Sequence, residues 1–369
     1  MTAKRLITLV LTVFQFQLQR PATSKEIRLA ALIPWNGTWP IGPRMASALL
    51  VAFDTIKNDL NLLPDYNLTY DWRDSECDTG ATLRSMADLQ AKTPPIHAFI
   101  GPGCSVGCMP GGYLAAHWDN PMISFGCGEA TLSDKVQYPT FVRTVGTYAQ
   151  TGKFFLKIME EYNWDRVAIL SSTESLWSQV ASFVKDEIDN AKSGGYMVSY
   201  FQVFSPGVTT DEQFRSMFLS AREVAHVFIL VGYGSSIRQI MLSLHDLDMI
   251  TTQYAYFTFE ITPENCKGSD GRDEDACEAF EGLMDIANYI PETQEYQRFE
   301  DKVRQKMPEF AGLGYHMQPD DKVDLYAGFL HDAVVLYALA VHNLITHGGN
   351  FTNGRELMKH MTNRSFEGP

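Results

Sequence analysis

The sequence predicts an α/β protein of two lobes, each built on a doubly wound parallel sheet. Short runs rich in β-branched and aromatic residues alternate with amphipathic segments along most of the 369 residues. The connections between them are short, as in parallel strands joined by crossover helices. The alternation begins again after the segment 143–147. Because two sheets of this size exceed one hydrophobic core, we expect two lobes.

The first lobe is expected to open with a buried strand at 27–34 and a helix at 43–60. Ala46, Leu49 and Phe53 share one face of that helix, which is the spacing of an amphipathic helix. The following apolar runs continue the alternation. Further strands are predicted at 67–74, 97–102 and 121–126, with helices at 79–91 and 109–118.

The second lobe repeats the same pattern, with β-branched runs between helical segments. Its predicted strands are 166–172, 196–204, 225–233 and 254–261, and its predicted helices are 150–163, 176–191, 211–224 and 235–248.

Three further helical segments follow, and they are too few for a third domain. The longest apolar stretch, 325–345, is interrupted by Gly328, His331 and Asp332, so it is predicted to be a buried helix. The predicted helices are 293–308, 322–347 and 354–362. We assign 25–144 and about 284–347 to the first lobe, and 145–283 and about 348–369 to a second lobe that is incomplete at its C-terminus.

The N-terminus has the pattern of a secretory signal. Lys4 and Arg5 precede an apolar run at 6–14, and Ala-Thr-Ser at 22–24 supplies small residues for cleavage. We therefore predict a signal peptide over 1–24 and an extracellular or secreted location. Its removal takes away three basic residues and no acidic one, so the net charge of −14 becomes −17. Such a charge argues against nucleic acid or an anionic membrane surface as a partner.

Glycosylation sequons and cysteines agree with the secretory pathway. The four sequons place acceptor asparagines at Asn36, Asn67, Asn350 and Asn363. Six cysteines in a secreted chain indicate disulfides, and 15 pairings are open. Since the carboxyl ends of parallel strands share one edge, Cys77, Cys104, Cys108 and Cys127 should lie together, whereas Cys266 and Cys277 close a short acidic loop.

One segment, 103–107, matches the Gly-x-Ser-x-Gly motif of hydrolases, so a secreted esterase using Ser105 is an alternative. Histidines to pair with it are available at 331, 342 and 347. However, no oxyanion segment precedes it, and Pro110 predicts that the helix starts only at 109, leaving Ser105 in a loop. No dinucleotide loop, Walker loop or zinc motif is complete. We therefore expect a chain that is not an enzyme and binds no metal.

Three blocks of sequence carry a family resemblance: Asp74-Ser-Glu-Cys77, Phe99-Ile-Gly-Pro-Gly-Cys104, and Leu114-Ala-Ala-His-Trp-Asp-Asn-Pro121. They resemble the ligand-binding ectodomain of receptor guanylyl cyclases, most of all natriuretic-peptide receptors, over about 27–369. The resemblance implies the type I periplasmic-binding-protein-like fold and an extracellular peptide or small-molecule ligand. It also implies a homodimer that signals across the plasma membrane by rearrangement, with the cyclase in parts beyond this chain. We expect a truncated receptor; the alternative is a secreted solute-binding protein.

The same resemblance implies individual residues. It favours pairing Cys77 with Cys104 and Cys266 with Cys277. Relatives hold a chloride ion on a serine hydroxyl and two main-chain N–H groups, which here match Ser75, Gly103 and Cys104; no other cofactor is implied. A glycine turn with free N–H groups suits an anion.

The candidate ligand-binding residues are aromatic or acidic side chains close to strand ends, where clefts form. In the first lobe these are Trp35 and Trp72, and Trp39 and Trp118 share this placement. The second lobe supplies Tyr233 and Glu260, each near the end of a predicted strand.

Overall fold

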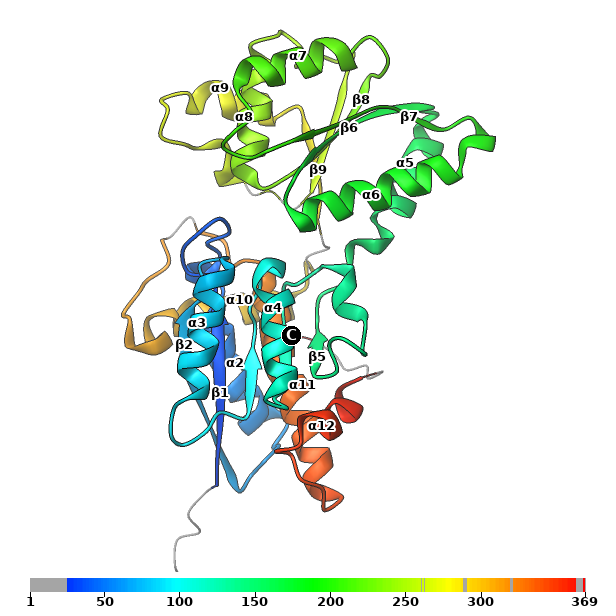
Figure 1. The fold of residues 1–369 in the computed structure, drawn as a ribbon. Coiled ribbons are helices and arrows are strands. Elements are labelled where there is room, and N and C mark those ends of the chain that lie inside the picture. The colour runs from blue at the N-terminus through cyan, green and yellow to red at the C-terminus, as the bar shows by residue number, and fades with distance from the viewer. Residues whose placement is uncertain are drawn as a thin grey trace, which may run out of the picture.

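The chain forms two lobes, each with a five-stranded parallel sheet between helices (Figure 1). The computed structural model describes residues 25–259, 261, 263–287, 291–318, 321–362 and 368. The predicted signal peptide at 1–24, the ligand-binding candidate Glu260 and the sequon at Asn363 lie outside these residues. The two sheets confirm the predicted α/β class.

The first sheet has the strand order β2-β1-β3-β4-β5, with every pair parallel. Strand β1, which lies inside this sheet, is fully buried over its last five residues, because helices cover both faces of the sheet. The strands are β1 (Lys25–Ile33), β2 (Tyr66–Asp74), β3 (Ala98–Ile100), β4 (Met122–Ser124) and β5 (Phe141–Arg143), and the helices between them are α2 (Ala48–Asp54), α3 (Thr79–Gln90) and α4 (Ser105–His117).

The second sheet has the order β10-β9-β8-β6-β7 and is also parallel. Separate apolar clusters lie on its two faces. Its strands are β6 (Arg166–Ser172), β7 (Met197–Phe204), β8 (Val227–Val231), β9 (Ala255–Phe259) and β10 (Leu283–Ile286), and its helices are α5 (Thr151–Tyr162), α6 (Ser175–Asn190), α7 (Asp211–Ala221), α8 (Gly234–His245) and α9 (Asp273–Phe280).

Three of these elements were missing from the sequence prediction: β5, β10 and α9. The two strands have three and four residues, which is too short for a period of two to stand out. Helix α9 falls partly inside the segment predicted to be an acidic loop. Its first turn contains Asp273, Glu274 and Asp275, and acidic side chains there stabilise a helix through its dipole.

The last three helices, α10 (Gln294–Lys306), α11 (Tyr326–Thr346) and α12 (Gly354–Met361), pack on the core of the first lobe. Helix α11 is long and apolar enough to cross a membrane by length and composition, but 67% of its most apolar window is buried within the protein. It is therefore the core helix that its interrupted apolar run predicts.

Helix α12 corrects the predicted lobe boundary, which placed about 348–369 in the second lobe. Its buried residues Leu357, Met358 and Met361 belong to the core of the first lobe. The Asp119 carboxylate accepts hydrogen bonds from the N–H groups of Gly354 and Arg355, both at 3.2 Å. The connection from α11 is short, so the apolar face of α12 meets the nearest core. Figure 1 shows α11 and α12, orange to red, in the lobe that contains β1.

A tyrosine on α11 provides a test of this packing. Tyr337 is fully buried, and its hydroxyl has no hydrogen-bond partner among the described residues. We expect Tyr337→Phe to raise the free energy of unfolding by about 1 kcal/mol, because an unsatisfied buried hydroxyl is removed. The matched control is Tyr256→Phe, which removes a bond from the Tyr256 hydroxyl to the Met249 carbonyl (2.9 Å) and should lower it by about 1 kcal/mol. Urea unfolding of both variants tests this prediction. A lower free energy of unfolding for Tyr337→Phe than for the wild type would contradict the packing.

Candidate functional site

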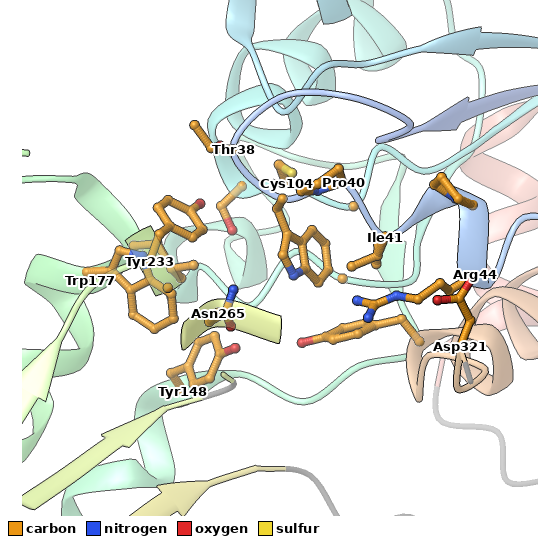
Figure 2. Close-up of a pocket in the computed structure, with 18 of the residues that line it drawn as sticks. Thr38, Pro40, Ile41, Arg44, Cys104, Tyr148, Trp177, Tyr233, Asn265 and Asp321 are labelled. Carbon is orange, nitrogen blue, oxygen red and sulfur yellow. The ribbon is translucent and has the colours of Figure 1, made fainter. Parts of the chain in front are cut away.

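The two lobes face each other across a cavity of about 310 Å³ (Figure 2). It lies beyond the carboxyl ends of strands β1, β3, β4, β6, β8 and β9, the edge where ligands bind in open parallel sheets. Its volume is at the lower end of the range for small-molecule sites. The lining residues are Thr38, Trp39, Pro40, Ile41, Pro43, Arg44, Gly103, Cys104, Ser105, Gly126, Tyr148, Leu176, Trp177, Tyr233, Gly234, Asn265, Tyr315, Asp321 and Tyr326.

Two aromatic pairs form opposite walls of this cavity. In the first lobe, Trp39 meets Tyr326 edge-on, with ring centroids 4.7 Å apart. In the second lobe, Trp177 meets Tyr233 edge-on at 5.2 Å, and Tyr148 lies 6.2 Å from Trp177. Such rings can present their apolar faces to a bound group. The edge-to-face contact within each pair keeps both rings in position.

The charged residues of the wall are already engaged within the protein. The Arg44 guanidinium pairs with the Asp324 carboxylate at 3.2 Å. The Asp321 carboxylate accepts a hydrogen bond from the N–H of Gln318 at 2.8 Å. The cavity therefore combines aromatic surface with amide and hydroxyl groups, and the positive charge of Arg44 is already paired.

The turn from β3 into the cavity corrects one sequence prediction. Helix α4 begins at Ser105 rather than at 109, and Pro110 lies inside it. A proline in this position has no N–H to donate to the carbonyl of Val106. The Thr79 hydroxyl donates to that carbonyl instead, at 2.9 Å. A residue distant in sequence thus lets the helix start earlier than Pro110 alone predicts.

Ser105 is consequently the first residue of a helix, but its surroundings do not support an esterase. Its side chain is buried, and its hydroxyl oxygen accepts a hydrogen bond from the N–H of Glu129 at 3.4 Å. The three histidines proposed as partners bond elsewhere. His331 contacts Thr55 and Asp332, His342 accepts from the N–H of Leu63, and His347 contacts the carbonyl of Asn343.

Three disulfides resolve the pairing that the sequence left open. Cys77 is bonded to Cys104 and Cys108 to Cys127, with Cα atoms 5.3 and 6.4 Å apart, at the carboxyl edge of the first sheet. Cys266 is bonded to Cys277, with Cα atoms 4.9 Å apart. These are ordinary Cα separations for a disulfide. The bonds fit an oxidising compartment such as the cell exterior.

The residues matched to a chloride site form a set of unpaired donors. Ser75 is fully buried, and its hydroxyl has no partner within the described part of the chain. The neighbouring disulfide holds its turn beside Gly103 and Cys104, whose N–H groups also have no acceptor among the described residues. The Asp74 carboxylate is engaged elsewhere, accepting from the N–H groups of Trp35 and Asn36. This donor set suits a small anion.

The aromatic candidates of the sequence analysis separate into two groups. Tyr233 lines the cavity, as does Trp39. Trp35 and Trp72 instead pack together at 5.6 Å and contact Phe310, and neither lines the cavity. The sequence offered no signal for Tyr326, which a distant helix brings to the cleft.

A second contact between the lobes lies beside the cavity. Glu129, fully buried, follows β4 in the first lobe, and Gln179 is on α6 in the second. The Gln179 side-chain amide donates to the Glu129 carboxylate and accepts from the N–H of Ala130 at 3.3 Å. The Thr131 hydroxyl also donates to that carboxylate, at 3.2 Å. This network fixes how α6 sits against the first lobe.

The described sequons lie at the surface. Asn36, Asn67 and Asn350 are all exposed. At Asn350, the side-chain oxygen accepts from the hydroxyl of Thr352, the third residue of its sequon, at 2.9 Å. Glycosylation of these asparagines stays a prediction.

Comparison with known proteins gives the family. A sequence model of the receptor family ligand binding region matches residues 44–369. Atrial natriuretic peptide receptor 3 of Rattus norvegicus is 27% identical over 363 residues, covering 94% of this chain and 65% of that receptor. The speract receptor of Strongylocentrotus purpuratus is 22% identical over 383 residues, covering 92% and 33%. Guanylate cyclase 32E of Drosophila melanogaster is 23% identical over 327 residues, covering 86% and 27%.

The chain thus spans less than two thirds of the length of these relatives. The family match covers most of the chain and includes Tyr326 of the first wall and the whole aromatic wall of the second lobe, whereas Trp39 precedes it. It is a match to a ligand-binding region and not to a catalytic domain. The chain therefore belongs to the receptor family ligand binding region, and its relatives are natriuretic peptide receptors and receptor guanylate cyclases.

Proposed function

We propose that this chain is the extracellular part of a cell-surface receptor of the receptor guanylyl cyclase type, and that it captures its ligand in the cavity between the lobes. The observation that carries the proposal is the cavity itself, about 310 Å³ with an aromatic pair on each side. A space of this size accepts a small molecule or one or two side chains of a peptide. The name of one relative, atrial natriuretic peptide receptor 3, favours a peptide.

The arrangement of the receptor is part of the same proposal. Two copies of the chain form a homodimer on the outer side of the plasma membrane, and ligand capture changes how they are arranged. Production of cGMP takes place in parts of the receptor beyond this chain. The three disulfides and the relatives that are named receptors support the extracellular location.

Binding in the cavity can be tested with a simple probe, N-acetyl-L-phenylalaninamide, which has one aromatic ring and two amide groups. We expect the secreted protein to bind it measurably in isothermal titration calorimetry, and Trp39→Leu to weaken binding at least tenfold because one wall is lost. Tyr113→Ala is the control, since Tyr113 is exposed on α4 and outside the cavity. Undetectable binding, or equal effects of both variants, would count against the proposal.

We also propose that Ser75, Gly103 and Cys104 hold a chloride ion. Their unpaired hydroxyl and N–H groups support this assignment. Crystals grown in bromide should give an anomalous peak beside Ser75, and Ser75→Ala should reduce it. The absence of a peak in the wild-type crystals would remove the proposal.

A further inference from the structure

A disulfide-closed segment of the second lobe leads directly into the cavity wall. We call residues 266–277 the strap; its ends are joined by the Cys266–Cys277 disulfide. The residue before it, Asn265, lies in the short 3-10 helix Pro263–Cys266 and lines the cavity. The position of Asn265 therefore depends on how the strap is held.

One guanidinium group fixes the strap to α8. Arg238 is only 8% exposed, and its Nε donates to the carbonyl of Cys266 at 2.8 Å. Its two terminal nitrogens donate to the two carboxylate oxygens of Asp270, both at 2.6 Å, and one also donates to Asp273 at 3.0 Å. Asp273 in turn accepts from the N–H of Gly268 at 2.8 Å. The main chain next to Asn265 is thus held by a forked ion pair as well as by the disulfide.

The side chain of Asn265 is seated on the first turn of α8. A Cβ atom on Gly234 would lie 2.4 Å from its amide carbon and nitrogen, so only glycine leaves room for the amide at this point. Figure 2 shows the side chain of Asn265 between those of Tyr233 and Tyr148. Asn265 is therefore fixed from the helix side and from the strap side.

We propose that Asn265 determines specificity by recognising an amide group of the ligand, and that the Arg238 clamp and the Cys266–Cys277 bond position it for this. The inference rests on the proposed function of the cavity. An amide side chain donates and accepts at once, so it can bond to a ligand amide while keeping a partner in the protein. Because the positive charge of Arg44 is paired with Asp324 and aromatic pairs line both walls, the ligand group is an aromatic amide without a negative charge.

The decisive experiment compares two probes that share a phenyl ring. N-acetyl-L-phenylalaninamide carries the ring and amides, whereas 2-phenylethanol carries the ring without an amide. We expect Asn265→Leu to weaken binding of the amide probe about tenfold while binding of 2-phenylethanol changes less than twofold. Arg238→Lys should produce the same selective loss, because lysine keeps the charge but cannot form the fork.

The outcomes separate the two proposals. If the wild type binds neither probe, the cavity is not the ligand site and the proposed function fails. If the amide probe binds and both variants leave the ratio of the two affinities unchanged, Asn265 has no role in recognition and only the present inference fails. If a variant loses affinity equally for both probes, the residue has only a structural role, and that result would also overturn the inference. If the peptide Gly-Gly-Phe-Gly-Gly binds more tightly than the amide probe, the aromatic amide belongs to a peptide ligand. If the peptide binds more weakly, it belongs to a free small molecule.

Discussion

Replacing both Cys77 and Cys104 by serine is expected to lower the free energy of unfolding by about 3 to 4 kcal/mol. The bond joins residues 27 apart in sequence, and closing a loop of this length in the unfolded chain has an entropic effect of that order. A local effect adds to it. Glu76 and Cys77 both have positive φ, at 53° and 51°, and non-glycine residues adopt this conformation only when the surroundings hold them.

The same substitution should also weaken ligand capture, because Gly103 and Cys104 line the cavity. Urea unfolding gives the stability, and calorimetry with N-acetyl-L-phenylalaninamide at a temperature where the variant stays folded gives the affinity. The control replaces Cys108 and Cys127 by serine; their disulfide closes a loop of similar length, and neither residue lines the cavity. We expect both pairs to lose stability and only the first to lose affinity. An unchanged unfolding midpoint for the first pair would contradict the structure.

Truncation of Glu129 to alanine should cost about 2 to 3 kcal/mol and loosen the contact between the lobes. It leaves the Gln179 amide and the Thr131 hydroxyl without the carboxylate that they donate to. It also removes a negative charge close to the half-buried guanidinium of Arg143; burial lowers the pKa of that group, and Glu129 acts against the shift. Two independent consequences therefore follow from one side chain.

Small-angle scattering and urea unfolding together test this prediction. We expect Glu129→Ala to increase the radius of gyration as the lobes separate, and Gln179→Ala to give the same change. Thr131→Val serves as the control, because Thr131 bonds to Glu129 within the first lobe and should leave the radius unchanged. Identical scattering curves for all four proteins would show that the network does not set the lobe arrangement.

The sequence predicted most of the scaffold because buried parallel strands and amphipathic helices have strong periodicity. Strand β6 was predicted at its observed bounds, and α3 within one residue. The prediction was wrong where tertiary contacts determine the bounds or the position of a helix. The start of α4 depends on Thr79 satisfying the Val106 carbonyl, and the place of α12 depends on Asp119 and the core of the first lobe. Neither contact leaves a local pattern in the sequence.

The site was harder to predict than the fold for the same reason. Tyr233 ends a strand run, so its position at the carboxyl edge was foreseeable. Trp35 also follows the end of a strand, but its side chain packs in an aromatic cluster with Phe310. Asn265 lines the cavity in a segment whose contacts with Arg238 and a disulfide leave no local pattern in the sequence. A rule based on strand ends finds the edge of the sheet, whereas the residues that line a cleft depend on packing.

The most direct test of the account is amide hydrogen exchange of the purified protein with and without saturating N-acetyl-L-phenylalaninamide. If the cavity between the lobes captures the ligand, exchange should slow on both walls at once, at 103–106 in the first lobe and at 233–236 in the second. Slowed exchange in only one lobe, or only at sites away from the cavity, would contradict the account.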